Sequence, residues 1–212
     1  MRRELVAAAG RRFARLTTDA VVRTPRLWRL FRPLMRKQFD TLAPVWDTMR
    51  DAGHLLPYEA ALESVEPPPK RALDLGTGTG QGAFALARRF PHAEVVGADV
   101  AERMLERARA NTPRDVAGRV RFEHADASAL PYADESFDLV AHANMIPFFD
   151  EVVRVLAPRG QVLFAWSGGD ETPIYVGSDR LRRELSRRGF TDFAEFDAGS
   201  GTALLARKAA GA

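Results

Sequence analysis

The sequence predicts a doubly wound α/β domain with a mostly parallel sheet, and two observations support this. From residue 70 onward, short apolar runs alternate with segments of helical periodicity, joined by short connections. Within residues 71–90, one apolar run turns abruptly into four alternating glycines and then continues as a helix. The N-terminus of a helix after such a turn presents unpaired backbone N–H groups to an anionic or nucleotide-like ligand.

Each element of the sheet can be assigned from its local pattern. The glycine turn precedes a helix that extends to about Phe90, and Ala-Pro-Arg-Gly at 157–160 is expected to form a turn. The last two strands are expected to pair as a C-terminal β-hairpin, which completes a seven-stranded sheet. Strands are expected at 71–75, 93–99, 119–126, 137–143, 161–167, 191–198 and 201–208, and further helices at 101–111, 148–156 and 179–189.

An N-terminal helical extension over 1–66 is expected to act as a basic arm or lid on the domain at 70–208. Helices are predicted at 2–16, 26–42, 39–53 and 57–65, and Pro33 is expected to kink or interrupt the second of them. Three consecutive prolines at 67–69 form a stiff stop, and they mark the predicted domain boundary.

The charge of the chain is distributed unevenly. Residues 1–40 contain eleven Lys or Arg and three Asp or Glu, whereas the other 172 residues contain 20 basic and 25 acidic ones. The basic segment at 26–42 carries an apolar stripe, so it can either pack on the domain as a lid or lie on an anionic membrane surface. Nucleic acid is a third candidate partner for the basic segment. No groove motif accompanies the segment, so we expect no binding of nucleic acid.

Composition excludes several classes of protein. The chain has no cysteine, which rules out disulfides, thiolate metal sites and cysteine nucleophiles. No apolar run approaches the roughly 20 residues needed to span a bilayer, and the N-terminus lacks the apolar core of a secretory signal. No cluster of His, Asp and Glu has metal-ligand spacing, so we expect no metal. Because the chain lacks cysteine, a membrane span and a signal core, we expect a cytoplasmic location, with peripheral membrane contact as an alternative.

Two aspartates lie at the ends of neighbouring predicted strands. Asp99 follows the second strand, where a carboxylate can accept hydrogen bonds from ribose hydroxyls; its alternative role is to cap the next helix. Asp126 follows the third strand, where it can accept a hydrogen bond from the exocyclic amino group of an adenine, or cap a loop. Together with the glycine turn, these carboxylates favour a nucleotide-like ligand.

Four ordered segments resemble the successive motifs of class I S-adenosylmethionine-dependent methyltransferases. They read ALDLGTGTG, VVGADVAERML, HADASALPYADESFDLV and RVLAPRGQVLFA, and they are similar to the small-molecule subgroup that includes ubiquinone and menaquinone biosynthesis methyltransferases. The resemblance implies a Rossmann-like fold, S-adenosylmethionine as cofactor and S-adenosylhomocysteine as product. It also implies cofactor-binding roles for Asp74, Gly76, Thr77, Gly78, Asp99, Val100, Met104, Asp126, Ala127 and Asn144.

The candidate for catalysis is His142, at the end of the fourth strand, where it would act as a general base. Its alternative role is a packed histidine, and His54 and Asp170 are weaker candidates. The chain departs from the family pattern at Phe39, where a tyrosine is frequent, and in the short segment that follows the fourth strand. Both departures bear on the methyl acceptor rather than on the glycine turn.

The resulting hypothesis is a methyltransferase that acts on a small, apolar or lipid-like molecule. One alternative is a non-catalytic S-adenosylmethionine-binding or membrane-recruitment module. A second is a nucleotide-dependent oxidoreductase, whose usual glycine spacing of GxGxxG differs from the GxGxG found here. The oligomeric state is open, with a homodimer as one alternative.

Overall fold

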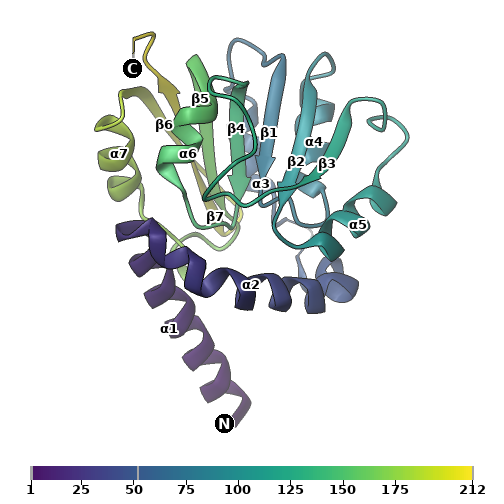
Figure 1. The fold of residues 1–212 in the computed structure, drawn as a ribbon, viewed down its shortest axis with the longest axis vertical. Coiled ribbons are helices and arrows are strands. Elements are labelled where there is room, and N and C mark those ends of the chain that lie inside the picture. The colour runs from purple at the N-terminus through teal and green to yellow at the C-terminus, as the bar shows by residue number, and fades with distance from the viewer. Residues whose placement is uncertain (1, 52, 212) are drawn as a thin grey trace.

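The computed structural model describes residues 2–51 and 53–211, with side chains from residue 12 onward. Its centre is a seven-stranded sheet in the order β3-β2-β1-β4-β5-β7-β6 (Figure 1). The first five strands run parallel, and β7 is antiparallel to both of its neighbours. The predicted fold class and the C-terminal hairpin are therefore confirmed.

The bounds of the elements agree with most of the predicted ones. The strands are β1 (Arg71–Leu75), β2 (Glu94–Asp99), β3 (Val120–His124), β4 (Phe137–Ala143), β5 (Leu156–Trp166), β6 (Phe190–Ala198) and β7 (Gly201–Lys208). The helices of the same region are α4 (Gln81–Arg89), α5 (Glu102–Asn111), α6 (Phe149–Val155) and α7 (Ser178–Ser186), with a 3₁₀ turn, η3, at Gly169–Glu171.

Both faces of the sheet are buried, as a doubly wound fold requires. One face packs against α4, α5 and α3 (Leu56–Leu62), through side chains such as Tyr58 and Phe84. The opposite face packs against α6 and α7, through side chains such as Val152 and Leu181. Helix α3 precedes the predicted boundary at 67–69 in the sequence, yet it packs with the sheet.

The Ala-Pro-Arg-Gly segment lies inside β5 rather than between two elements, so the turn predicted there is wrong. Pairing with β4 passes from Phe137–Leu156 directly to Leu139–Gln161, which leaves residues 157–160 as an irregular bulge. Arg159, within this bulge, has a φ of 63°. The residues predicted to reverse the chain therefore form a bulge at the start of β5.

The N-terminal segment forms longer and differently divided helices than expected. It contains α1 (Arg2–Arg23), η1 (Pro25–Leu27), α2 (Trp28–Leu42) and η2 (Ala43–Met49), a 3₁₀ helix where an α-helix was predicted. Pro33 does not interrupt α2, because Trp28 before it and Met35 after it pack into the same apolar cluster. No helix in the described residues is long and apolar enough to cross a bilayer.

Helix α2 runs across the edge of the sheet at which the parallel strands end, whereas α1 projects away from the body (Figure 1). Contacts fix α2 in this place, since it packs against α5, and the Asp40 carboxylate accepts a hydrogen bond of 3.1 Å from the backbone N–H of Arg103. The carboxyl ends of parallel strands are where ligands bind in open α/β sheets. The N-terminal segment therefore covers the expected ligand site.

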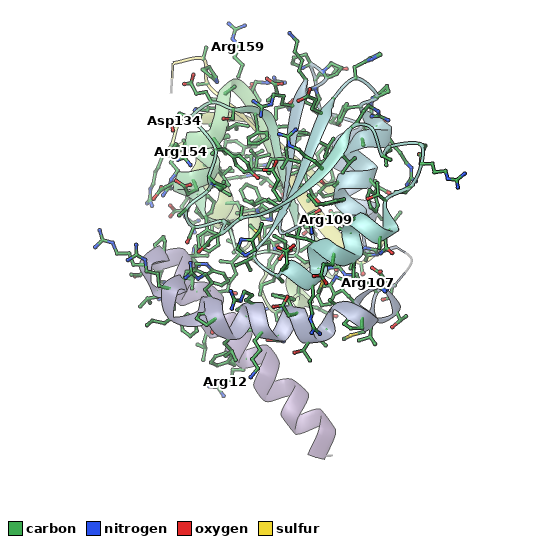
Figure 2. All side chains as sticks on the ribbon, turned by 45° about the vertical axis from the view of Figure 1, so that its right-hand side comes forward. Arg12, Arg107, Arg109, Asp134, Arg154 and Arg159 are labelled. Atoms are coloured by element: carbon green, nitrogen blue, oxygen red, sulfur yellow. The ribbon has the colours of Figure 1, made fainter. Side chains whose placement is uncertain are left out.

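The loop that follows Asp126 is held by Arg154 of α6, whose labelled side chain lies near Asp134 in Figure 2. The Arg154 guanidinium donates hydrogen bonds to the backbone oxygens of Leu130 and Tyr132, at 2.9 and 2.7 Å, and to Asp134 at 2.8 Å. This network fixes the chain between β3 and β4, and with it the position of the loop at the strand ends.

Candidate ligand site at the glycine turn

The turn between β1 and α4 has a backbone that only glycine adopts readily. Gly76, Gly78 and Gly80 have φ values of 70°, 55° and 92°. The backbone N–H groups of Gly76 and Thr77 donate to the carbonyl of Ala98 on β2, at 2.8 and 3.0 Å. This pairing anchors the turn to the neighbouring strand and places it beside the end of β2.

Asp74, the fourth residue of β1, supports the turn from beneath. Its buried carboxylate accepts hydrogen bonds from the Tyr58 hydroxyl at 3.0 Å and the Thr77 hydroxyl at 2.6 Å. A Cβ at Gly82 would lie only 2.6 Å from the carboxylate, so α4 starts directly above it. Burial raises the pKa of Asp74 to about 6, against the opposing effect of these hydrogen bonds. Asp74 is thus a supporting residue rather than an exposed ligand group.

The raised pKa of Asp74 predicts a pH dependence of stability. Because the folded-state pKa exceeds the unfolded value of 3.8, this contribution is fully present below pH 4 and is lost as the pH rises through 6. The loss should amount to about 3 kcal/mol. Urea unfolding from pH 4 to 7 should therefore show the wild type losing stability relative to Asp74→Asn as the pH rises. A relative gain over that range would contradict this assignment.

Asp99 ends β2 beside the turn and has acceptor capacity to spare. Its carboxylate accepts hydrogen bonds from the backbone N–H groups of Gly78 and Ala101, both at 2.9 Å. These bonds use two of roughly four acceptor positions of a carboxylate. Burial raises the pKa of Asp99, although the same hydrogen bonds oppose the shift. The half-buried carboxylate of Asp99 thus links the glycine turn to the start of α5.

Asp126 lies on the loop after β3, and its oxygens already have protein partners. Trp28 Nε1 donates to one oxygen at 2.8 Å, and Arg32 donates to the other at 2.7 Å. Ser128 donates from its backbone and its hydroxyl. Burial alone would raise the pKa of Asp126, but these hydrogen bonds outweigh it and lower the pKa. Side chains of α2 thus already bind the carboxylate of Asp126, which is the group expected to contact an adenine.

The expected adenine slot is covered in the same way. Met104 is buried in a cluster with Ala43 and Ala101, and Phe39 and Trp46 pack against this cluster. Val100 is half-buried at the end of β2, and Ala127 packs beside the apolar side chains of α2. The structure therefore brings Val100, Met104 and Ala127 to the same edge of the sheet as Asp99.

Three residues of the N-terminal segment that sequence reasoning missed lie at the turn. A Cβ at Gly78 would be 3.4 Å from Trp46 Nε1, which is buried without a hydrogen-bond partner among the described residues. Asp47 accepts hydrogen bonds from Thr79 in the turn and from Asn111 of α5. The guanidinium of Arg50 lies 4.6 Å from the ring centre of Trp46.

Electrostatics connect Arg50 to the same site. Burial lowers the pKa of Arg50, while the carboxylates of Asp47, Asp74 and Asp99 act in the opposite direction. A sequence signal for this region exists, because an aromatic residue followed by aspartate occurs twice, as Phe39-Asp40 and Trp46-Asp47. The second pair begins seven residues after the first, and the rings of Phe39 and Trp46 are in edge-to-face contact with centroids 5.5 Å apart.

His142 lies inside the sheet packing. Its ring is fully buried, 4.4 Å between centroids from Phe164, and neither nitrogen has a hydrogen-bond partner among the described residues. Burial lowers the pKa of His142 to about 3, so the imidazole is neutral at ordinary pH. These observations favour the packed histidine that the sequence left as the alternative.

The other polar candidates are spread over the same edge of the sheet. Asn144 joins the ends of β4 and β5, since its side-chain oxygen accepts a hydrogen bond of 3.0 Å from the backbone N–H of Ser167. His54 contacts the backbone oxygen of Asp51 at 2.8 Å, and Asp170 is exposed on η3. Among the described residues, no three His, Asp or Glu side chains are grouped to hold a metal ion.

An apolar cluster extends from the turn toward the N-terminal helices. Met145, after β4, links the two, because a Cβ at Gly76 would lie 2.6 Å from its sulfur. Trp28 and Phe148 are in edge-to-face contact there, with ring centroids 5.5 Å apart. The buried members of the cluster are Val21, Trp28, Ile146 and Phe148, with Phe31, Met35, Met145 and Ile174 among those packed against them.

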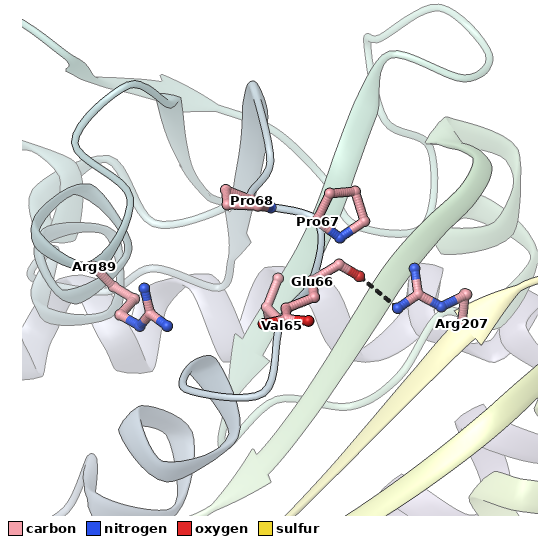
Figure 3. Close-up of a pocket in the computed structure, with 6 residues that line it drawn as sticks. All are labelled: Val65, Glu66, Pro67, Pro68, Arg89 and Arg207. Atoms are coloured by element: carbon pink, nitrogen blue, oxygen red, sulfur yellow. Dashed lines mark hydrogen bonds between the residues drawn. The ribbon is translucent and has the colours of Figure 1, made fainter.

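A cavity of about 500 Å³ lies at the opposite edge of the sheet, where the parallel strands begin (Figure 3). Its lining includes Arg89 and Arg207, and Arg207 donates a hydrogen bond to the backbone oxygen of Glu66. None of the predicted site residues lines this cavity. It is separate from the glycine turn.

The fold and the site define a Rossmann-like α/β protein with a nucleotide-type site at its strand ends. Residues 72–160 match the family model described as a methyltransferase domain. This part of the chain is similar to class I methyltransferases, among them the ubiquinone and menaquinone biosynthesis methyltransferases.

Two curated relatives and one solved structure illustrate the similarity. The chain is 39% identical over 150 residues to a malonyl-[acyl-carrier protein] O-methyltransferase of Halorhodospira halophila, covering 65% of this chain and 49% of the relative. It is 41% identical over 141 residues to a demethylmenaquinone methyltransferase of Thermus thermophilus, covering 59% and 62%. The structure of an S-adenosylmethionine-dependent methyltransferase from Aquifex aeolicus superposes with a TM-score of 0.64 at 18% identity, covering 76% and 95%.

The chain thus spans about half to three-fifths of the length of these curated relatives. Their names describe acceptors as different as a carrier-bound acyl group and a quinone precursor. The similarity therefore covers the domain and does not identify the acceptor.

Proposed function

We propose that the protein transfers a methyl group from S-adenosylmethionine to a small apolar acceptor. The observation that supports this most strongly is the pairing of the glycine turn with Asp99 at the ends of β1 and β2, inside a methyltransferase domain. Asp99 retains acceptor positions for two ribose hydroxyls. The glycines at 76 and 78 allow a ligand to approach the backbone closely.

The residues at the turn fit the amino-acid end of this cofactor. Trp46 Nε1 is a buried donor without a partner among the described residues, and it lies beside Gly78. A buried N–H of this kind costs free energy unless an acceptor reaches it. Arg50, stacked on the same indole, adds a positive charge that suits a carboxylate. Met145 and Trp46 lie against the turn, so both must shift when the ligand enters.

Bound S-adenosylmethionine supplies a methyl group already activated by a sulfonium. The chain therefore has mainly to orient the two molecules and exclude water. Asp99 would fix the ribose, and the glycine turn with Trp46 and Arg50 would fix the amino-acid end. The apolar side chains around Met145 and Phe148 would keep water from the transfer position. The burial of His142 argues that no histidine base acts from β4.

The acceptor is proposed to bind in the apolar cluster between α1, α2 and the segment after β4. This cluster consists of aromatic and aliphatic side chains, including Trp28, Phe148 and Ile146, and it adjoins the turn through Met145. Such side chains favour an apolar ring or chain over a charged acceptor.

A transfer assay tests the proposed reaction. The protein is incubated with methyl-labelled S-adenosylmethionine and an organic-solvent extract of host cells, and labelled product is separated by chromatography. A labelled apolar product is expected, and it should disappear when S-adenosylhomocysteine is added in excess. Retained cofactor affinity with no labelled product from any extract would instead favour the non-catalytic module.

Arg32 is expected to compete with the cofactor for Asp126. It is half-exposed, with 47% of its side-chain surface accessible, and such ion pairs contribute up to about 1 kcal/mol. Arg32→Ala should therefore strengthen S-adenosylhomocysteine binding up to about fivefold in calorimetric titrations. Arg29→Ala, on the same helix and without an ion pair among the described side chains, serves as the control. Weaker binding by Arg32→Ala would show that Arg32 helps to hold the ligand.

A further inference from the structure

The exposed large apolar side chains are concentrated in the N-terminal part of the chain. Phe13 and Leu16 of α1 are 49% and 62% exposed, and Leu30 and Leu34 of α2 are 73% and 53% exposed. Phe13 contacts Phe31 edge to face, with centroids 6.4 Å apart, which joins α1 to α2. We call these four exposed side chains and the surface around them the outer arm surface.

The inward and outward sides of α2 differ in their partners. Trp28 and Phe31 face the domain and pack with its apolar cluster. Leu30 and Leu34 are one helical turn apart on the other side, which the described residues leave uncovered. An apolar stripe on the solvent side of a helix usually marks a contact site, because water penalises its exposure.

The segment of the chain that carries this surface is strongly basic. Between residues 12 and 37 the sequence has eight Lys or Arg and one Asp. Arg32 pairs with Asp126, and Asp19 pairs with Arg180, so the single acidic group is already used. Figure 2 shows Arg12 on α1, away from the sheet. Exposed basic side chains of this segment that have no ion pair among the described residues include Arg23, Arg26, Arg29, Arg36 and Lys37.

We propose that the outer arm surface docks on an anionic lipid bilayer. Apolar side chains interspersed with arginines match a membrane interface, where acyl chains take the apolar groups and headgroup phosphates take the cations. A second copy of the chain would bring like charges together, which opposes pairing through this surface. The inner side of α2 lines the proposed acceptor site, so docking would place that site next to the lipid.

Vesicle co-sedimentation of the full chain tests the docking. Vesicles of phosphatidylcholine with about one-third phosphatidylglycerol should bind the wild type, and pure phosphatidylcholine vesicles should bind it at least tenfold less. Leu30→Ser with Leu34→Ser, and separately Arg29→Gln with Arg36→Gln, should each weaken binding to the anionic vesicles about tenfold. Raising the salt concentration should weaken binding of the wild type.

The matched control removes two arginines at the other edge of the sheet, one between α5 and β3 and one in the bulge of β5. Arg114 and Arg159 are both exposed, and Arg114→Gln with Arg159→Gln should bind vesicles within twofold of the wild type. Equal loss of binding in the control and arm variants would overturn the proposal. Failure of the wild type to bind the anionic vesicles would also overturn it, whether or not this surface forms dimers or binds RNA. Methyl transfer is not measured, so the result is independent of the proposed reaction.

Discussion

Replacing Asp99 with alanine is expected to abolish most of the thermal stabilisation that S-adenosylhomocysteine gives the protein. At a concentration 100 times its dissociation constant, a ligand stabilises the folded state by about 2.7 kcal/mol. For a chain of this size, that corresponds to a rise in Tm of about 5–10 °C. Because hydrogen bonds to a charged group contribute about 1.5–3 kcal/mol each, losing those to two ribose hydroxyls should weaken binding at least about 100-fold.

Asp138→Ala is the matched control for this substitution. The Asp138 carboxylate also accepts two backbone hydrogen bonds, from Lys70 at 2.8 Å and Arg71 at 2.9 Å, but it lies where the strands begin. This variant should lose stability without ligand yet keep the full rise in Tm with S-adenosylhomocysteine. A full rise in Asp99→Ala would contradict the assignment of Asp99 to the ribose.

Gly82→Ala is expected to destabilise the fold although alanine favours helices. In an unhindered helix this substitution would stabilise by up to about 1 kcal/mol. Here the new Cβ would lie 2.6 and 2.8 Å from the two carboxylate oxygens of Asp74, and that group is itself held by Tyr58 and Thr77. Overpacking of this kind costs about 1–3 kcal/mol, so chemical denaturation should show a net loss of stability.

Gly118→Ala provides the comparison, because nothing lies within 4 Å of a Cβ at that position. Its stability should stay within about 0.5 kcal/mol of the wild type. If Gly82→Ala were instead as stable as Gly118→Ala, the start of α4 would not rest on the Asp74 carboxylate. The support that Asp74 gives the glycine turn would then be absent.

Most of the sheet could be predicted from the sequence because local patterns specify it. The strand at 137–143 was predicted with the bounds that β4 has, since an apolar run there is flanked by polar loops. The glycine turn was recognisable because positive φ values demand glycine. The bulge at 157–160 was not predictable, because the same residues suit a free turn and an irregular strand edge.

The covering of the site could not be derived in this way. Contacts such as Trp28 with Asp126, or Tyr58 with Asp74, join residues far apart in sequence, and no local periodicity encodes them. The orientation of His142 was equally hidden. In a sheet with both faces buried, alternation does not show which face a polar residue takes, and the structure places it against Phe164.

Calorimetric titration decides whether the glycine turn and Asp99 hold S-adenosylmethionine. S-adenosylhomocysteine is titrated into the wild-type chain, with NADH as the matched nucleotide. One S-adenosylhomocysteine should bind per chain, with heat that Asp99→Ala largely removes, and NADH should not bind. Saturable binding of NADH with no heat from S-adenosylhomocysteine would contradict this assignment.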